Sequence, residues 1–271
     1  MHFGLYSVFF RNATIHDKLS GKSLLNHIFD YAPESKPLSA LIDKKPQNGY
    51  SGKPVKYVTK NLVLSLSATT SGTFKEYHFK YLDEDGLEGR NIWCQPGDIL
   101  IQRGNTIEYV GVSAIYNGQS NKYIFPDLMI RVRANECLVE TKYLYYALSS
   151  EKIRNYLRSR AIGSAGTMPK INQSTLLSTE IPLFSKTQQR QIVAEIESRF
   201  SLSDILMQSI DDAKVQAETL RQSILKKAFS GKLVPQDPND EPASLLLERI
   251  RTEKHAQQSN GRKPRKKRKT A

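Results

Sequence analysis

The chain has 271 residues, of which 39% are hydrophobic and 9% aromatic, so it can bury a sizeable core. It contains no run of about 18 apolar residues, and its start, MHFGLYSVFFRNATIHDK, has neither a basic region nor a small-residue cleavage site, so we expect neither a membrane span nor a secretory leader. Cys94 and Cys137 form no CxxC pair, which favours a reducing compartment. We therefore expect a soluble, cytoplasmic protein with no membrane contact.

The net charge of +13 is unevenly distributed along the chain. Residues 1–188 hold 23 Lys and Arg against 16 Asp and Glu, residues 189–261 hold 10 against 11, and residues 262–271 hold 7 against none. A basic globular part favours binding to a polyanion such as DNA, because Lys and Arg contacts to phosphates release condensed counterions. A basic surface that only serves solubility is the alternative interpretation.

Between residues 53 and 133, short runs alternate apolar and polar residues and are bounded by Gly, Asn, Pro and Asp. A period of two predicts half-buried β-strands. The runs are 53–59, 62–70, 97–104, 109–116 and 127–133. In the last run, Leu128, Ile130 and Val132 are expected to point inward, whereas Arg131 and Arg133 are expected to point to solvent.

Helical spacing begins after the strands. In residues 142–161, Leu144, Leu148, Ile153 and Leu157 recur at roughly helical intervals, which predicts one amphipathic helix. The chain then passes through a glycine-rich loop, 163–173, and a strand-like run, 178–184.

A long helix is predicted next, because no Pro or Gly occurs between Thr187, a possible cap, and Gly231. About 40 residues would make a rod of roughly 60 Å, too long to bury one apolar stripe on a small domain. We therefore expect a coiled-coil seam that pairs with another helix, although an amphipathic helix lying on its own domain is the alternative. The seam residues step by four and three: Leu206, Ile210, Ala213, Ala217, Leu220 and Ile224.

The fold class predicted by these elements is α+β, a β-rich globular domain followed by a long coiled-coil-forming helix. The expected parts are an unassigned segment (1–35), a DNA-binding domain (36–187), a dimerisation or spacer helix (188–230), a turn with a short helix (231–256) and a basic disordered tail (257–271). Ser244 is the expected cap of the short helix.

Residue patterns for catalysis are sparse. The five histidines are scattered without metal-ligand spacing, so we expect no metal site and no catalytic residue. Pro126-Asp127 followed by Glu140-Thr141-Lys142 resembles the PD…ExK string of nucleases that hold Mg²⁺ between two carboxylates. This string is short enough to arise by chance. A Mg-dependent nuclease and a non-specific nucleic-acid-binding oligomerisation protein remain the alternative functions.

Four loops in the basic domain are rich in hydrogen-bond donors: 43–54, 67–72, 102–109 and 163–173. Arg and Lys suit guanine, Asn and Gln suit adenine, hydroxyls suit several bases, and glycine lets backbone amides approach phosphates. The candidate DNA contacts are first Arg103, Asn105, Lys170 and Asn172, and then Lys45, Asn48, Tyr50, Lys53, Thr69, Thr70 and Thr167.

Several strings resemble one protein family. RQSILKKAFSGKLVPQDPNDEPASLLLERIR, residues 221–251, is similar to the end of a conserved helical region in type I restriction-modification specificity (S) subunits. GDILIQRGNTIEYVG, FPDLMIRVR and GTMPKINQ resemble parts of the target recognition domain of these subunits. The resemblance covers about residues 38–254 and is strongest over 163–251.

The resemblance implies a non-catalytic subunit that reads one half-site of double-stranded DNA and docks DNA methyltransferase (M) and restriction (R) subunits. S-adenosylmethionine, ATP and Mg²⁺ would be bound by those partners, with no cofactor in this chain. Family members usually carry two domain-plus-helix units in tandem, whereas this sequence carries one. We therefore expect a homodimer, or pairing with another half-length S subunit, on a two-fold symmetric site.

Overall fold

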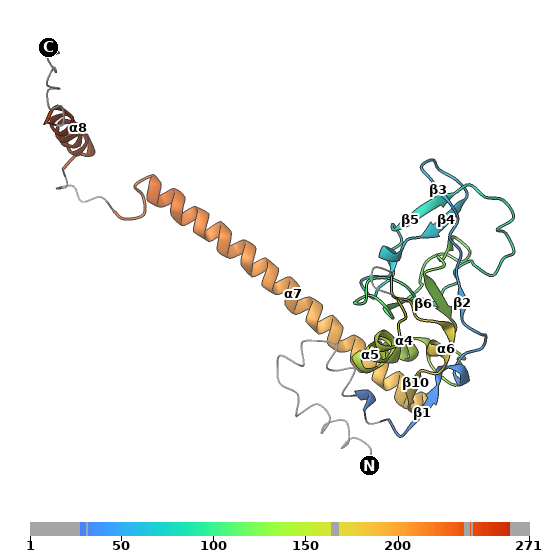
Figure 1. Cartoon of the computed structure of the whole chain (residues 1–271). Helices are drawn as coiled ribbons and strands as arrows, with labels where there is room; N and C mark the ends of the chain where they lie inside the picture. The colour runs from blue at the N-terminus through green and yellow to red at the C-terminus, as the bar shows by residue number, and fades with distance from the viewer. Residues whose placement is uncertain (1–27, 31, 164–167, 236–238, 240, 261–271) are drawn as a thin grey trace, which may run out of the picture. The chain divides into compact units, whose positions relative to one another are not determined.

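The computed structural model describes residues 28–30, 32–163, 168–235, 239 and 241–260 (Figure 1). The chain divides into two compact units, the first ending at Asp204 and the second beginning at Ile205. The expected segment 1–35 lies almost entirely outside the described residues. Within the described part, no helix is both long enough and apolar enough to cross a membrane.

Three small β-sheets form the frame of the first unit (Figure 1). In the smallest, β1 (Glu34–Pro37) pairs antiparallel with β10 (Glu180–Leu183). The second sheet is antiparallel and has the order β2 (Gln47–Asn48), β9 (Met129–Val132), β6 (Ile99–Gln102) and β7 (Ser113–Ile115). The third has the order β3 (Pro54–Val55), β5 (Phe79–Leu82), β4 (Asn61–Leu64) and β8 (Tyr123–Ile124).

The five runs predicted as strands each contain a strand, but every strand is shorter than its run. The run 62–70 is an example, since β4 ends at Leu64 and the chain then turns through the 3₁₀ helix η2 (Leu66–Ala68). A second 3₁₀ helix, η1 (Leu38–Ala40), follows β1. β1, β2, β5 and β8 were not predicted, because two to four residues with no long apolar run give too little periodicity.

The second sheet is buried on both faces. Along β6, Ile99 and Ile101 belong to one core while Leu100 belongs to another, which also contains Tyr116 and Phe125. In this sheet, the alternation of polar and apolar residues along a strand therefore does not mean that the polar residues are exposed to solvent. Arg131 of β9 was expected to face solvent, but the structure corrects this, because its face of the sheet is covered and the residue is 4% exposed.

Three short helices cover the other face of this sheet and help to form the first core. They are α4 (Thr141–Ser149), α5 (Glu151–Ser159) and α6 (Gln173–Leu177). The prediction of one helix over 142–161 was wrong, because Ser150 has extended backbone angles (φ −61°, ψ 146°) between α4 and α5. The Ser150 hydroxyl donates to the Ala147 carbonyl oxygen at 2.7 Å, which closes the end of α4.

α7 (Lys186–Phe229) has 44 residues, which corresponds to about 66 Å of helix. The expected cap, Thr187, is inside the helix. Ser185 is the cap instead: its hydroxyl accepts from the Gln188 N–H (3.4 Å), and its own N–H donates to Gln188 Oε1 (3.1 Å), which is a capping box.

The C-terminal end of α7 is closed as predicted at Gly231, whose φ of 67° is in the left-handed region. The Gly231 N–H donates to the Ala228 carbonyl (3.0 Å), and the Lys232 N–H donates to the Lys227 carbonyl (2.8 Å). These two bonds define a Schellman motif.

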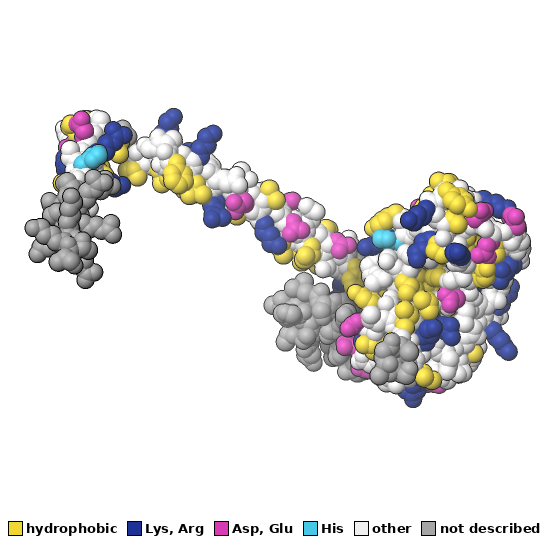
Figure 2. Space-filling model, turned by 45° about the horizontal axis from the view of Figure 1, so that its top comes forward, with side chains coloured by type: hydrophobic (Ala, Val, Ile, Leu, Met, Phe, Trp, Pro, Cys, Tyr) yellow, Lys and Arg dark blue, Asp and Glu magenta, His cyan; other side chains and the backbone are white. Residues whose placement is uncertain are grey.

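The two parts of α7 differ in burial. Ile192 and Ile196 are buried in the first core of the globular unit. In the second unit, by contrast, Leu206 (44%), Leu220 (61%) and Ile224 (44%) are exposed. Figure 2 shows hydrophobic side chains in patches along this part of the helix.

α8 (Ala243–Asn260) follows α7 in the described part of the second unit. It begins before Ser244, so Ser244 is in its first turn and is not its cap. The helix also includes residues 257–260 of the tail that was predicted to be disordered, and the rest of that tail lies outside the described residues.

Candidate nucleic-acid interface

Two loops that are far apart in the sequence are joined beside the second sheet. Arg103 follows β6, and its Nε donates to the carbonyl of Ile171 at 3.2 Å. The Ile171 N–H donates back to the Arg103 carbonyl at 2.9 Å. β-Bridges also join Gly104 and Ile162 to Lys170. The first-ranked candidates Arg103 and Lys170 therefore belong to one surface.

Gly104 serves this close approach of the two loops. A Cβ atom at this position would lie 2.9 Å from Lys170 Cγ and 3.1 Å from Leu128 Cδ2. The N–H groups of Arg103 and Gly104 both donate to the Leu128 carbonyl, at 2.8 Å and 3.3 Å. The backbone amides expected to face phosphates are therefore used inside the fold at this loop.

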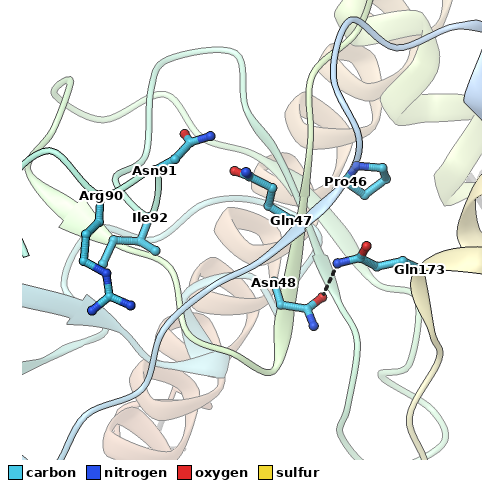
Figure 3. A pocket seen from close by; sticks show the side chains of 7 residues that line it. All are labelled: Pro46, Gln47, Asn48, Arg90, Asn91, Ile92 and Gln173. Atoms are coloured by element: carbon cyan, nitrogen blue, oxygen red, sulfur yellow. Dashed lines mark hydrogen bonds between the residues drawn. The ribbon is translucent and has the colours of Figure 1, made fainter.

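β2 is joined to the start of α6, which follows the loop that contains Lys170. Gln173 Nε2 donates to Asn48 Oδ1 at 3.1 Å, as Figure 3 shows. Asn172 has a structural role, because its Oδ1 accepts from the Thr175 N–H and the Ser174 hydroxyl (2.7 Å each) and caps α6. Asn48 and Asn172 are both exposed.

The hydroxyl-rich loop is tied to the fold by a buried glutamine. Gln102 Nε2 donates to the hydroxyl oxygens of Thr69 and Thr70 at 3.1 Å each. Asn105 Nδ2 donates to Gln102 Oε1 at 2.6 Å, and its Oδ1 accepts from the Thr106 N–H at 2.7 Å. Thr69 has no exposed surface, so its assignment as a DNA contact is corrected. Both polar atoms of the Asn105 side chain thus form hydrogen bonds within the fold.

The remaining candidates differ in their surroundings. Lys45 and Lys53 are exposed. The Tyr50 hydroxyl donates to Glu84, a hydrogen bond that raises the pKa of the tyrosine, and the Arg90 guanidinium carbon lies 4.5 Å from the centre of the ring. Thr167 lies outside the described residues.

A hollow of about 450 Å³ opens beside Asn48 and contains residues that the sequence did not single out (Figure 3). Its lining residues are Pro46, Gln47, Asn48, Arg90, Asn91, Ile92 and Gln173. Arg90 and Asn91 were missed because they follow an acidic, glycine-containing turn. No local pattern indicates that this turn meets β2.

Arg131 lies beneath the hollow and is bonded to two residues that line it. Its Nη2 donates to Gln47 Oε1 and to Asn91 Oδ1 (2.6 Å), and its Nη1 donates to the Trp93 carbonyl at 2.8 Å. Burial lowers the pKa of Arg131, an effect that the charge of Asp98 opposes. A guanidinium still remains protonated in proteins, so Arg131 acts only as a donor.

Asp98 is the anion of this buried network and is 1% exposed. It accepts from Arg133 Nε and from the Gln95 N–H (2.8 Å), and its Oδ2 lies 3.7 Å from Arg131 Nη1. The hydrogen bond to Asp98 raises the pKa of Arg133. Two cations therefore share one carboxylate below the polar hollow.

The nuclease alternative is not supported by this geometry. Asp127 accepts from the Ser51 hydroxyl (2.6 Å) before β9, whereas Glu140 lies after it and pairs with Lys186 (2.9 Å) of α7. Lys142 pairs with Glu197 at 2.6 Å. Among the described residues, no group of three His, Cys, Asp or Glu side chains could hold a metal ion.

Comparison with known families shows to which protein family the chain is related. Residues 50–213, more than half of the chain, match the family model described as type I restriction modification DNA specificity domain. The chain belongs to this family. The match includes most of the second and third sheets and the first part of α7.

Curated relatives of this specificity-domain protein are specificity subunits of type I restriction enzymes. The EcoKI specificity subunit of Escherichia coli K12 is 27% identical over 94% of this chain and 57% of its own length. The EcoDI specificity subunit of Escherichia coli is 34% identical over 71% of this chain and 43% of its own length. The chain thus spans about half the length of the curated relatives it matches.

Solved structures share the α+β fold of this specificity-domain protein. A chain from a study of complex assembly and conformational transition of the type I R-M system has a TM-score of 0.60 and 20% identity. The HsdS subunit from Thermoanaerobacter tengcongensis has a TM-score of 0.52 and 16% identity. Each comparison covers 80% of this chain and 53% of the other chain.

Proposed function

We propose that this chain is a DNA-recognition subunit of a type I restriction-modification system, in which the first unit reads one half-site of double-stranded DNA without catalysis of its own. The observation that carries the proposal is the convergence of Asn48, Arg103 and Lys170 on one surface of a domain in a DNA specificity family. Cations on such a surface position the duplex on its phosphates, while amides and Arg read base edges.

Binding-site selection with the full chain and a library of random duplexes tests this proposal. The expected result is a defined consensus, with Arg103→Ala relaxing the preference at one position by about 1 to 3 kcal/mol. Lys170→Ala is expected to weaken binding to all DNA sequences alike. It should also reduce the slope of the logarithm of affinity against the logarithm of salt concentration by about one. Equal competition by a scrambled duplex would instead favour the non-specific oligomerisation protein.

Incubation of the purified chain with Mg²⁺ and plasmid DNA tests the absence of catalysis. The expected outcome is intact plasmid for both the wild type and Asp127→Ala. Cleavage that Asp127→Ala abolishes would overturn this part of the proposal.

The second unit supports a proposal about assembly. Its apolar seam on α7 would pair with the same helix of a second copy, or with another half-length specificity subunit. Exposed Leu206, Ile210 and Ile224 on a helix of 44 residues support this pairing, because an apolar stripe of this length is stable in water when another helix covers it. The paired helices would dock M and R subunits in the cytoplasm, and those subunits would bind S-adenosylmethionine, ATP and Mg²⁺.

Sedimentation equilibrium at micromolar concentration tests the pairing. Leu220→Glu places a charge in the seam and is expected to shift the protein to monomers. Val215→Glu is the matched control, because Val215 is also exposed (67%) but lies nine residues, about two and a half turns, after Leu206 and therefore on the opposite face of the helix. Equal effects of the two substitutions, or a monomeric wild type, would contradict pairing with a second copy of this chain.

A further inference from the structure

Buried Arg131 fixes the orientation of two side-chain amides that line the hollow. A guanidinium only donates hydrogen bonds, so the amide atom that faces it must be the oxygen. Gln47 Oε1 and Asn91 Oδ1 both accept from Arg131 Nη2. The amide nitrogens of Gln47 and Asn91 are therefore turned away from Arg131, and within the described part of the chain no acceptor binds either of them.

A third amide is oriented by Gln173. Because Gln173 Nε2 donates to Asn48 Oδ1 at 3.1 Å, Asn48 Nδ2 remains as a donor at the hollow (Figure 3). Arg90, held over the Tyr50 ring at 4.5 Å, adds guanidinium donors. The side chains of the lining thus present mainly N–H groups, and Gln173 Oε1 is the acceptor that these contacts leave open.

This donor pattern selects among base edges. In the major groove guanine offers two acceptors, N7 and O6, and thymine offers one, O4, beside its methyl group, whereas adenine and cytosine each present an amine that would meet donors here. The charge below the hollow also favours acceptors, because Arg131 and Arg133 share the single carboxylate of Asp98 and leave a net positive charge. An edge with two acceptors and no donor, which guanine alone presents, is therefore the chemical complement of this surface.

We infer that the hollow between β2 and residues 90–92 reads a guanine edge, and that Arg131 is the positioning residue that makes the hollow a donor surface. This inference rests on the proposed function and specifies which surface carries base preference. A phosphate also offers only acceptors, but a phosphate contact weakens all sequences alike, whereas a base contact acts at one position.

Gln47→Glu is the decisive substitution. Glutamate has the shape of glutamine and keeps an oxygen for Arg131, but it replaces the outward amine by an acceptor. Binding-site selection with the full chain and a random duplex library is expected to return a consensus in which one guanine changes to adenine or cytosine in the variant. Replacing that guanine by 7-deazaguanine, which lacks the N7 acceptor, should weaken the wild type about tenfold or more.

Gln119→Glu is the matched control, because it adds the same charge at an exposed glutamine outside the hollow and should leave the consensus unchanged. Arg131→Lys retains the charge but lacks the planar guanidinium that donates to both amides. The preference for guanine over other bases at this position should therefore fall about tenfold. The urea midpoint is measured in parallel. If Arg131→Lys does not fold, Gln47→Glu and 7-deazaguanine still decide the question.

The outcomes separate the two proposals. An unchanged consensus for Gln47→Glu overturns the guanine assignment and leaves the proposed function standing. Uniform weakening of all duplexes with a smaller salt slope also overturns it, because the hollow would then contact phosphate. A wild-type chain that selects no consensus overturns the proposed function together with this inference.

Discussion

Removing the charge of Asp98 should destabilise the first unit strongly. Asp98→Asn preserves the volume but leaves buried Arg131 without an anion and weakens the bonds from Arg133 and the Gln95 N–H. Breaking a buried ion pair by removing one partner costs about 3 to 5 kcal/mol. At a urea m-value of about 2 kcal/mol/M, this corresponds to a midpoint lower by roughly 2 M.

The protein supplies its own probe for this measurement. Trp93 is the single tryptophan, it belongs to the first unit, and its carbonyl accepts directly from Arg131 Nη1 at 2.8 Å. Its fluorescence in a urea titration therefore reports on the unit that contains the charge network. Glu88→Gln is the control, because Glu88 pairs with Lys60 at 2.8 Å with both side chains about 60% exposed, and water and salt screen such an exposed pair so that it contributes little to stability. If Asp98→Asn lowered the midpoint no more than Glu88→Gln, the reasoning about the buried network would be refuted.

Three further predictions concern stability and reactivity. Gly49→Ala would place Cβ 1.9 Å from a backbone oxygen and should cost more than about 2 kcal/mol in urea unfolding, whereas Gly89→Ala, with open space around it and φ of 78°, should cost about 1 kcal/mol. Hydrogen bonds from its basic partners on α7 lower the pKa of Glu140, so the stability that Glu140 contributes is fully present above about pH 5 and is lost as the pH falls. In Glu140→Gln, the free energy of unfolding, measured by urea titration at a series of pH values, should therefore decrease less steeply towards acid pH than in the wild type. In native protein a thiol reagent should label Cys137, which is exposed, while Cys94, whose pKa is raised by burial, should react only in urea; rapid labelling of both would contradict the fold.

The strands could be located from the sequence where alternation was long enough, but their exposure could not be inferred. Ile130 and Val132 point to the first core as expected. Arg131 alternates with them and still lies inside, because the third sheet and its loops cover the opposite face. Which layer covers a strand depends on contacts between residues distant in the chain, and a local period does not encode them.

The candidate site could be predicted only in part, for the same reason. Loops with Arg103 and Lys170 were found by composition, and the structure brings both to one surface. The hollow, however, depends on Arg131 contacting Gln47, 84 positions away. Hydrogen-bond capacity was also overestimated at Thr69, which a buried glutamine holds inside the fold. A donor-rich loop signals polar chemistry, but it does not tell whether the donors serve a ligand or the loop itself.

Helix ends illustrate a different limit. The capping box at Ser185 and Gln188 has the S-x-x-Q spacing, so this helix start can be read from the sequence, two residues before the expected cap Thr187. The break at Ser150 had no comparable signal, because the apolar spacing continues across it. Glycine was a more reliable signal of a helix end than apolar spacing, since Gly231 ends α7 at a position that requires a left-handed backbone conformation.

The closed ends of α7 restrict how its length can change during evolution. With Ser185 and Gly231 fixing the two boundaries, an inserted residue would shift the distal part by about 1.5 Å and rotate it by about 100°. A single insertion would therefore turn half of the apolar stripe out of line with the rest. Insertions of about seven residues, with a rotation of roughly 20°, would keep the stripe continuous. A change of helix length in steps of about 10 Å therefore keeps the apolar stripe nearly continuous, whereas a change of one or two residues does not.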